Sequence, residues 1–293
     1  MTEIKLESIS INPKTFLKKH NVLPALPEAV NEIRQIIFSE RVSIRRIVEI
    51  IQRDPGLVAQ ILKIVNSAFY SVPRDVKDIS LAVAYLGINE VYHIVISVYV
   101  MEALAGGDKK EFHRIWYHSN YTAMVSKDLA KKYEPLLNSN DLWVHSILHD
   151  IGKLVYLKFY PDHFKALTDY CIQQGCTIRE AEEHFKLPHS SYFGELLCDH
   201  WGLPEDIKET CGHHDLEDLK EMDISTEKGR IRRIVTIGNL LTILATERLR
   251  KEIKQKISDS VQKSLGCSES EFLVTMANVY EIKVEMDKVF KGR

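Results

Sequence analysis

Residues 143–158, WVHSILHDIGKLVYLK, decide the fold of this chain. Together with the preceding leucine, their apolar members recur at helical spacing: Leu142, Trp143, Ile147, Leu148, Ile151, Leu154 and Val155. This spacing predicts one buried helix. Within it, His149, Asp150 and Lys153 need partners, because an unpaired buried charge costs several kcal/mol or more. A metal ion is one candidate partner, since imidazole nitrogens and carboxylate oxygens are ordinary ligands of Zn, Mn, Fe and Ni.

A second interpretation needs no metal. Asp150 would pair with Lys153, and the histidine would be a hydrogen-bonded core residue, the commoner role of a lone histidine on an apolar helix. His149 is not alone, however. Further histidines and one asparagine lie on other predicted helices or at their ends: His118, His189, His213, His214 and Asn239. Such a spread over several segments is typical of a site assembled by tertiary folding.

The composition limits the classes of protein to which this chain can belong. The 293 residues are 45% hydrophobic, enough for one large or two modest cores. The net charge of −2 gives no overall field that favours nucleic acid or an anionic membrane. The five cysteines form no CxxC pair and the N-terminus lacks an apolar signal region, which favours reduced thiols in the cytoplasm. The most apolar stretch, residues 91–105, contains His93 and Glu102 and is too short to span a bilayer.

Helical periodicity and capping signals extend along the chain, and we find no strand pattern and no internal repeat. The predicted helices span or begin at residues 28–38, 44, 55, 80–86, 88–104, 109–134, 143–158, 178, 189, 204, 231–245 and 272–289. Asp54-Pro55 is an N-cap followed by proline at the first helical position, and Thr177 with Glu180 forms a capping box. We expect the charged residues 246–256 to form a solvated helical face. The chain is therefore predicted to be all-α.

Several short motifs resemble the HDOD branch of the HD superfamily of metal-dependent phosphohydrolases. They are LPALP (23–27), Asp54-Pro55, NSAFY (66–70), WYHS (116–119), HDIGK (149–153), HSSYFG (189–194) and WGLP (201–204). They cover roughly residues 20–245 in order. The resemblance implies a two-lobed multi-helix fold, and Gly106-Gly107 marks the break between the lobes. We expect a lead-in at 1–22, an N-terminal lobe at 23–105, an HD-like lobe at 108–245 and a helical extension at 246–293.

The resemblance also implies a metal site. In HD phosphohydrolases, a first histidine, a His-Asp pair and a distant aspartate hold one divalent ion. The matching positions here are His118, His149, Asp150 and Asn239. The related HD-GYP phosphodiesterases add three second-metal positions, which match His189, His213 and His214. The ion would be Fe, Mn, Ni or Zn, and Lys153 would face a substrate phosphate.

Two positions depart from the catalytic pattern. Asn239 stands where the pattern has aspartate, and Arg114 stands where HD-GYP enzymes have glutamate. The Gly-Tyr-Pro signature is also absent after His213-His214. With Asp150 as the remaining carboxylate, two divalent ions are electrostatically unfavourable, whereas one ion with neutral histidines is compatible with the set.

Three functions follow as hypotheses. The first is a non-catalytic signalling or regulatory module of bacterial signal transduction, which binds a protein partner or, through Arg114 and Lys153, a nucleotide-like anionic ligand. The second is a metal-dependent phosphohydrolase acting on a nucleotide or cyclic dinucleotide, with Asp150 and Lys153 in the reaction. The third, a regulator acting on nucleic acid, is not supported by the charge balance. His145 has zincin-like spacing to His149, but Ser146 stands where a metalloprotease needs glutamate, so we expect a structural role for His145.

Overall fold

The computed structural model describes residues 26–37, 39, 42–67, 69, 70, 72, 75–138 and 141–291. The predicted lead-in at 1–22 and residues 23–25 of the first motif lie outside this set. Every regular element within it is helical, which confirms the all-α prediction. No single helix among these residues is long and apolar enough to cross a bilayer; α5 and α6 reach that length only as a pair bent by 116°.

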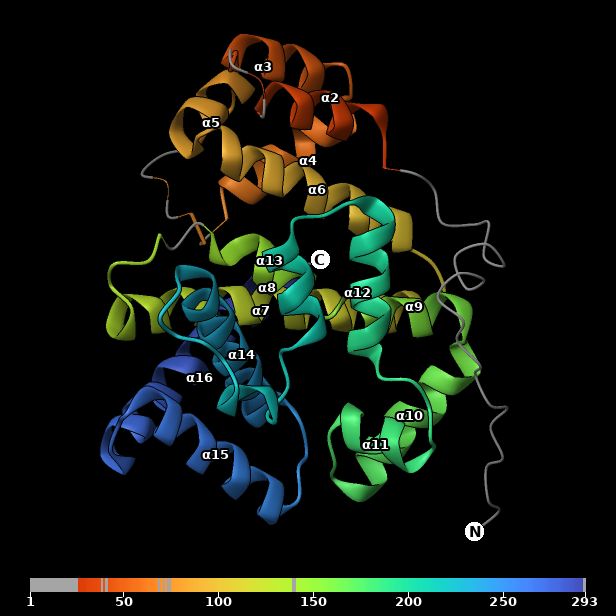
Figure 1. Ribbon diagram of the computed structural model, residues 1–293, viewed down its shortest axis with the longest axis vertical. Coiled ribbons are helices and arrows are strands. Elements are labelled where there is room, and N and C mark those ends of the chain that lie inside the picture. Colours follow the sequence, from red (N-terminus) through yellow and green to blue (C-terminus); the bar gives the residue numbers. More distant parts are fainter. Residues whose placement is uncertain are drawn as a thin grey trace.

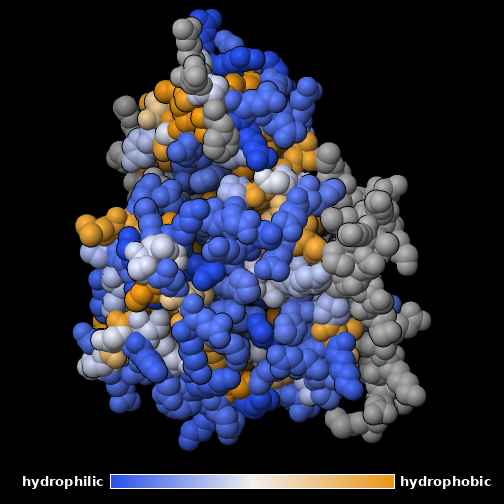
Figure 2. All heavy atoms as spheres, in the orientation of Figure 1, coloured by the Kyte–Doolittle hydropathy of each residue, from blue (hydrophilic) through white to orange (hydrophobic). Residues whose placement is uncertain are grey.

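Five helices form the N-terminal lobe at the top of Figure 1. They are α2 (Glu28–Ile37), α3 (Ile44–Gln52), α4 (Pro55–Val65), α5 (Ile79–Leu86) and α6 (Ile88–Leu104). The predicted caps are present: the Ser43 side chain accepts the Arg46 N–H, and the Asp54 side chain accepts the Leu57 N–H. On the face drawn in Figure 2, hydrophobic residues gather over α3 and α5 within a mostly hydrophilic surface. Exposed large apolar residues in or just before these two helices are Val42, Ile44, Leu81 and Tyr85.

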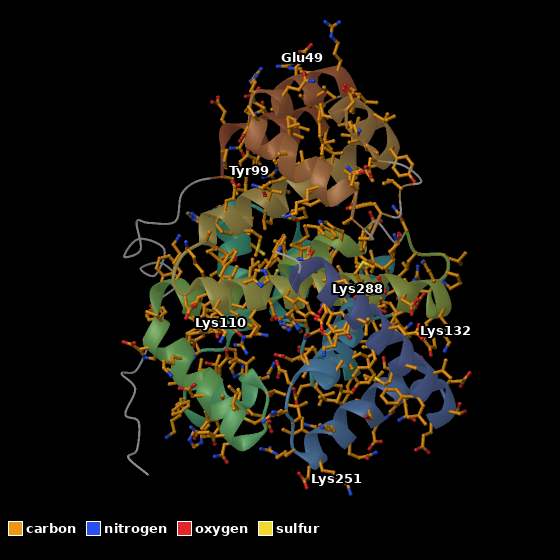
Figure 3. The ribbon with its side chains drawn as sticks, turned by 180° about the vertical axis from the view of Figure 1, so that it is seen from behind. Glu49, Tyr99, Lys110, Lys132, Lys251 and Lys288 are labelled. Carbon is orange, nitrogen blue, oxygen red and sulfur yellow. The ribbon has the colours of Figure 1, made fainter. Side chains whose placement is uncertain are left out.

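The second lobe is built around α7, which crosses the molecule from Lys110 to Lys132 (Figure 3). Its elements are α7 (Lys109–Tyr133), α8 (Leu142–Leu148), α9 (Ile151–Phe159), α10 (Pro161–Gln174), α11 (Ile178–His184), α12 (Ser190–Trp201), α13 (Glu205–Gly212), η1 (Asp218–Lys220) and α14 (Glu227–Thr246). Two more helices, α15 (Lys251–Leu265) and α16 (Glu269–Lys291), follow. Figure 1 shows α10 and α11 on one side of the lower half and α14 to α16 on the other.

The motif NSAFY joins the two lobes. Asn66 holds the loop after α4, because its side chain both donates to the Val76 carbonyl and accepts the Val76 N–H, each at 2.8 Å. Phe69 is buried and meets Trp143 of α8 edge to face, with ring centres 5.0 Å apart. The buried apolar residues of both lobes form one continuous cluster.

The central helix is not continuous, so the prediction of one helix over residues 143–158 was wrong. It breaks at His149 and Asp150, and Asp150 has φ −101° and ψ 15°. The apolar period runs across the break and therefore hides it. At this break, the His149 and Asp150 side chains lie beside His118 of α7 and His214, which follows α13.

The charged residues 246–256 are mostly exposed, as predicted for a solvated stretch, but the prediction that they form one helical face was wrong. The helix α14 ends at Thr246, and α15 begins at Lys251. Between them, the Arg250 N–H donates to the Gly175 carbonyl at 2.8 Å, which ties this turn to the end of α10.

Two glycines permit the close helix crossings that position the site. A Cβ on Gly152 would lie 1.7 Å from the Ser190 carbonyl oxygen, so α9 rests directly on the first turn of α12. A Cβ on Gly238 would lie 2.3 Å from Ser126 Oγ, so α14 also approaches α7 closely. The second crossing sets Asn239 beside His118.

Candidate metal centre

Three side chains from adjacent elements converge at the break between α8 and α9. His118 lies in the middle of α7, His149 follows α8, and Asp150 precedes α9. Their potential ligand atoms lie within 4.8 Å of one another. Asp150 Oδ2 is 3.4 Å from His118 Nε2 and 3.3 Å from His149 Nε2. The structure therefore brings together the first histidine and the His-Asp pair of the sequence motif.

His149 is oriented as a metal ligand. Its Nδ1 lies 2.7 Å from the Ser146 carbonyl oxygen, which can only accept, so Nδ1 carries the proton that it donates. In the neutral ring, Nε2 then presents a lone pair. This atom is buried, has no hydrogen-bond partner among the described residues, and faces the Asp150 carboxylate. Ligating histidines commonly donate their other N–H to a backbone carbonyl in this way, so the donor set fits a cation.

Asn239 provides an amide oxygen at the same place. Its Oδ1 accepts from His118 Nε2 at 2.9 Å, and its Nδ2 donates to the His214 carbonyl at 3.2 Å. Burial lowers the pKa of His118 to about 3, although Asp150 acts in the opposite direction. His118 is therefore neutral at pH 7, and it must give up its Nε2 proton to become a ligand at that atom.

Asp150 has two protein partners. Lys153 Nζ donates to Oδ2 at 2.7 Å, and His214 Nε2 lies 3.2 Å from Oδ1. Burial alone would raise the pKa of the Asp150 carboxyl, but the neighbouring His149 and Lys153 hold it well below its usual range. Burial likewise disfavours charged Lys153, yet the Asp150 carboxylate keeps the pKa of Lys153 above its ordinary value. The Asp150–Lys153 pair of the second interpretation is therefore present in the structure.

His214 completes the ring around Asp150. Its Nδ1 is 3.0 Å from the Thr210 carbonyl oxygen, so both ring nitrogens face acceptors. Burial lowers the pKa of His214, but the hydrogen bond to Asp150 and the charge of Asp215 outweigh it and raise the pKa overall. A protonated His214 would offset part of the charge of Asp150.

The other two predicted second-metal positions lie elsewhere. His189 is the N-cap of α12, and its Nε2 is 3.9 Å from Glu183 Oε1. The His213 side chain is 53% exposed, with its nitrogens 3.5 Å from Glu195 and Asp218. Consecutive residues after α13 point in different directions, so only His214 of the pair reaches Asp150. Within the described part of the chain, neither His189 nor His213 shares a close group of ligand atoms with Asp150.

A cavity of about 540 Å³ opens beside the cluster. His118, Asp150 and Lys153 form its floor. The other lining residues include Arg114, Phe164, Thr168, Cys171, Ile172, Ile178, Glu247 and Arg248. The cavity therefore combines an apolar wall from α10 and α11 with three cationic side chains, the arrangement expected of a site for a small ligand with an anionic group.

Glu247 is a cavity residue that the sequence did not indicate. It is the C-cap of α14, in the charged stretch predicted to be solvated, and it is exposed. Although the residue is exposed overall, desolvation of its carboxyl raises the pKa of Glu247, whereas Lys153 and Arg114 act to lower it. The apolar period of α14 ends at Thr246, which marks the end of the helix in the sequence but not the cavity beside it.

The residues resembling the HD pattern are thus assembled into a centre that can hold one divalent cation. The comparisons with solved structures agree with this fold. An HDOD domain protein from Geobacter sulfurreducens, 21% identical, aligns with a TM-score of 0.72 over 95% of both chains. A candidate metal-dependent phosphohydrolase from Shewanella amazonensis, 20% identical, aligns with a TM-score of 0.59 over 92% of this chain and 97% of that one. A candidate signal transduction protein from Marinobacter aquaeolei, 17% identical, aligns with a TM-score of 0.66 over 99% of this chain and 63% of that one.

The sequence also matches a curated protein. An uncharacterized protein of Treponema pallidum is 28% identical over 200 residues, which are 68% of this chain. The matched region spans only 39% of the length of that curated relative. The family model for the HDOD domain matches residues 23–216, which include the motifs in both lobes and all of the helices from α2 to α13. This match over most of the chain, together with the convergence of His118, His149 and Asp150, places the protein in the HDOD domain family.

Proposed function

We propose that this HDOD protein is a non-catalytic regulatory module that binds a small anionic ligand in the cavity beside Asp150. The observation that carries the proposal is the state of Asp150. Its carboxylate is already bound by Lys153 and His214, and the neighbouring position holds the neutral amide of Asn239. A hydrolytic centre needs carboxylates that fix the ion and offset its charge. Here the charge of Asp150 is offset by protein cations.

The cavity walls support binding of an anion. Lys153 and two arginines line the cavity, and Arg114 is held by Glu111 at 2.8 Å. A guanidinium can bind a phosphate group through two parallel hydrogen bonds. The apolar wall, which includes Phe164 and Ile178, suits a base or another flat group. A nucleotide-like ligand satisfies both parts of the cavity.

A cation remains compatible with the same site. His118, His149, Asp150 and Asn239 would hold it, and when bound it would polarise a phosphate oxygen as a Lewis acid. The metal-dependent phosphohydrolase is therefore the second candidate function, favoured by the unpaired Nε2 of His149. In that function Lys153 would neutralise a phosphate at the cavity floor.

Turnover and binding assays separate the two functions. The purified protein with added Mn, Fe or Ni should hydrolyse a chromogenic phosphodiester and cyclic dinucleotides slowly or not at all. Calorimetry with AMP and cyclic dinucleotides should show binding that weakens at least tenfold in Arg114→Ala. Arg45→Ala is the matched control, since that arginine is exposed on α3 and far from the cavity. Robust turnover that Asp150→Ala abolishes would overturn the regulatory proposal.

A further inference from the structure

A second group of metal-ligating side chains lies where the two lobes meet. Glu90 and His93 are one turn apart on α6, and Asp141 immediately precedes α8. One potential ligand atom from each lies within 4.8 Å of the others. Figure 1 shows α6 at the lower edge of the N-terminal lobe, and this helix packs on α8. The group thus draws ligands from both lobes and shares none with Asp150.

Two of its atoms are buried without a hydrogen-bond partner. Glu90 is only 4% exposed, and neither its Oε2 nor Nδ1 of His93 has a partner among the described residues. These atoms are 3.9 Å apart, too far for a hydrogen bond. Ligand atoms about 2.1 Å from a tetrahedral zinc lie about 3.4 Å apart, so a cation would draw the two together by about 0.5 Å. An unpaired buried oxygen otherwise costs about 1–3 kcal/mol.

A neighbouring tyrosine orients the Glu90 carboxylate. The Tyr70 hydroxyl donates to Glu90 Oε1, which fixes the carboxylate and leaves Oε2 available. The Asp141 side chain makes no capping hydrogen bond to α8. Lys127 is also near Glu90, but its ammonium lies 4.6 Å from the centre of the Phe69 ring, and Glu90 Oε2 remains without a hydrogen bond.

We propose that Glu90, His93 and Asp141 bind one divalent transition-metal cation, with zinc as the best match, at the junction of the two lobes. One imidazole nitrogen and two carboxylate oxygens are an ordinary ligand set for zinc and for its substitute cobalt. The cation supplies a bond between α6 and the segment before α8 in addition to the apolar contact of Phe69 with Trp143. This site stands independently of any ligand in the cavity beside Asp150.

Metal titration of the full chain, first freed of metal with chelator, tests the site. Asp150→Asn removes the charge at the first centre while keeping its shape. In this background we expect one equivalent of zinc, and a cobalt derivative with the visible absorption of a low-coordinate site. Adding Glu90→Gln, which keeps the acceptor for Tyr70, should remove that equivalent and the zinc-dependent rise in melting temperature. Asp141→Asn should weaken zinc binding at least tenfold if Glu90→Gln does not fold.

The matched control is Glu102→Gln, an exposed position on the same helix. It should leave the zinc stoichiometry and the cobalt spectrum unchanged. A folded Asp150→Asn protein that binds no zinc at micromolar concentration would overturn the proposal, as would equal zinc affinity with and without Glu90→Gln. Neither result affects the proposal of an anionic ligand in the cavity beside Asp150.

Discussion

Asn239 is held by two hydrogen bonds that an aspartate could not both keep. Its Nδ2 donates to the His214 carbonyl, and a carboxylate oxygen there would face another acceptor. We expect Asn239→Asp to lower the unfolding free energy of the metal-free protein by about 1–3 kcal/mol. The added negative charge should at the same time raise zinc affinity at the Asp150 centre by about tenfold.

Chemical denaturation in chelator and zinc calorimetry measure the two effects. Asn120→Asp is the matched control, because Asn120 on α7 also donates through Nδ2 to a backbone carbonyl, that of Trp116 at 2.8 Å. It should lose stability without gaining zinc affinity. An Asn239→Asp protein as stable as the wild type in chelator would contradict this account of the amide.

Glu182 makes stability depend on pH. Its carboxyl is buried, accepts the Ser190 N–H at 3.0 Å, and has its pKa raised by burial to about 8. An unfolded glutamate titrates near about 4.3, so between these values the folded chain holds a proton that the unfolded chain has lost. The contribution of Glu182 to stability is therefore full below this window and falls as pH rises, by up to about 1.4 kcal/mol per pH unit.

The variant Glu182→Gln does not titrate, and its amide oxygen can still accept from Ser190. Its unfolding free energy relative to the wild type should rise steadily from pH 5 to pH 8. Denaturation curves at each pH measure the difference. The neighbouring and exposed Glu183→Gln is the control and should show no such trend. Parallel profiles for Glu182→Gln and the wild type would rule out the shifted carboxyl.

Residue types in sequence order were enough to assemble part of the centre. His118, His149 and Asp150 belong to short motifs. Such motifs can be recognised in the sequence without knowing how the helices between them pack. Glu90, His93 and Asp141 belong to no motif, and 47 residues separate His93 from Asp141, so only the packing of α6 on α8 reveals them. His213 shows where motifs mislead. It is adjacent to His214 in the sequence, but adjacent side chains can point in different directions, and only His214 reaches Asp150.

At the scale of elements, the crossing of α9 and α12 depends on Gly152. An added Cβ would meet the Ser190 carbonyl oxygen at 1.7 Å, which neither backbone can accommodate without moving. We expect Gly152→Ala to reduce the unfolding free energy by about 3 kcal/mol or more, because the two helices must separate. The shift should also weaken zinc binding, since Lys153 and Asp150 flank the same turn.

Thermal and denaturant unfolding with zinc titration measure this effect. Gly56→Ala is the control, because the nearest atom to its Cβ would be Asp54 Oδ1 at 3.2 Å, the end of a side chain. Its effect should stay within about 1 kcal/mol. If Gly152→Ala is as stable as Gly56→Ala, the helices do not cross as closely as described.

Helix limits were predictable where a local signal sets them. The side chains of Ser43, Asp54 and Thr177 accept backbone N–H groups at the starts of α3, α4 and α11, so the residues themselves define those ends. The break between α8 and α9 has no such signal. At the break, Asp150 contacts Lys153 and His214, the second of which lies 64 residues away. The hydrophobic periodicity of the sequence carries no information on the contact with His214.

At the scale of the molecule, α16 is part of the core although the family match ends at residue 216. Three tyrosines of α7 bond to it: Tyr117 to Asp287 at 2.8 Å, Tyr121 to the Val279 carbonyl at 2.6 Å, and Tyr133 to Thr275 at 3.1 Å. Phe272, Val279 and Met286 are buried on the same helix. Family resemblance alone would place these residues in an extension of unknown importance.

We therefore expect a chain that ends at Gly266 to lose most of its cooperative unfolding transition, because buried α7 becomes exposed to water. Circular dichroism during thermal unfolding measures the loss. Tyr121→Phe is the control, since it removes one hydroxyl and keeps the packing, at a cost of about 1 kcal/mol. A truncated chain with the melting temperature of the full chain would show that α16 is dispensable.

The contact between Lys153 and Asp150 Oδ2 should couple the binding of a metal ion to the binding of an anion in the cavity. A metal ion that takes Oδ2 competes with the Lys153 ammonium, which lies at the cavity floor. An anion in the cavity attracts the same ammonium and so leaves Oδ2 to the metal. Coupling free energies are reciprocal, so cation and anion should raise each other's affinity by the same factor. Manganese titrations with and without sulfate measure that factor, which Lys153→Met should reduce to one.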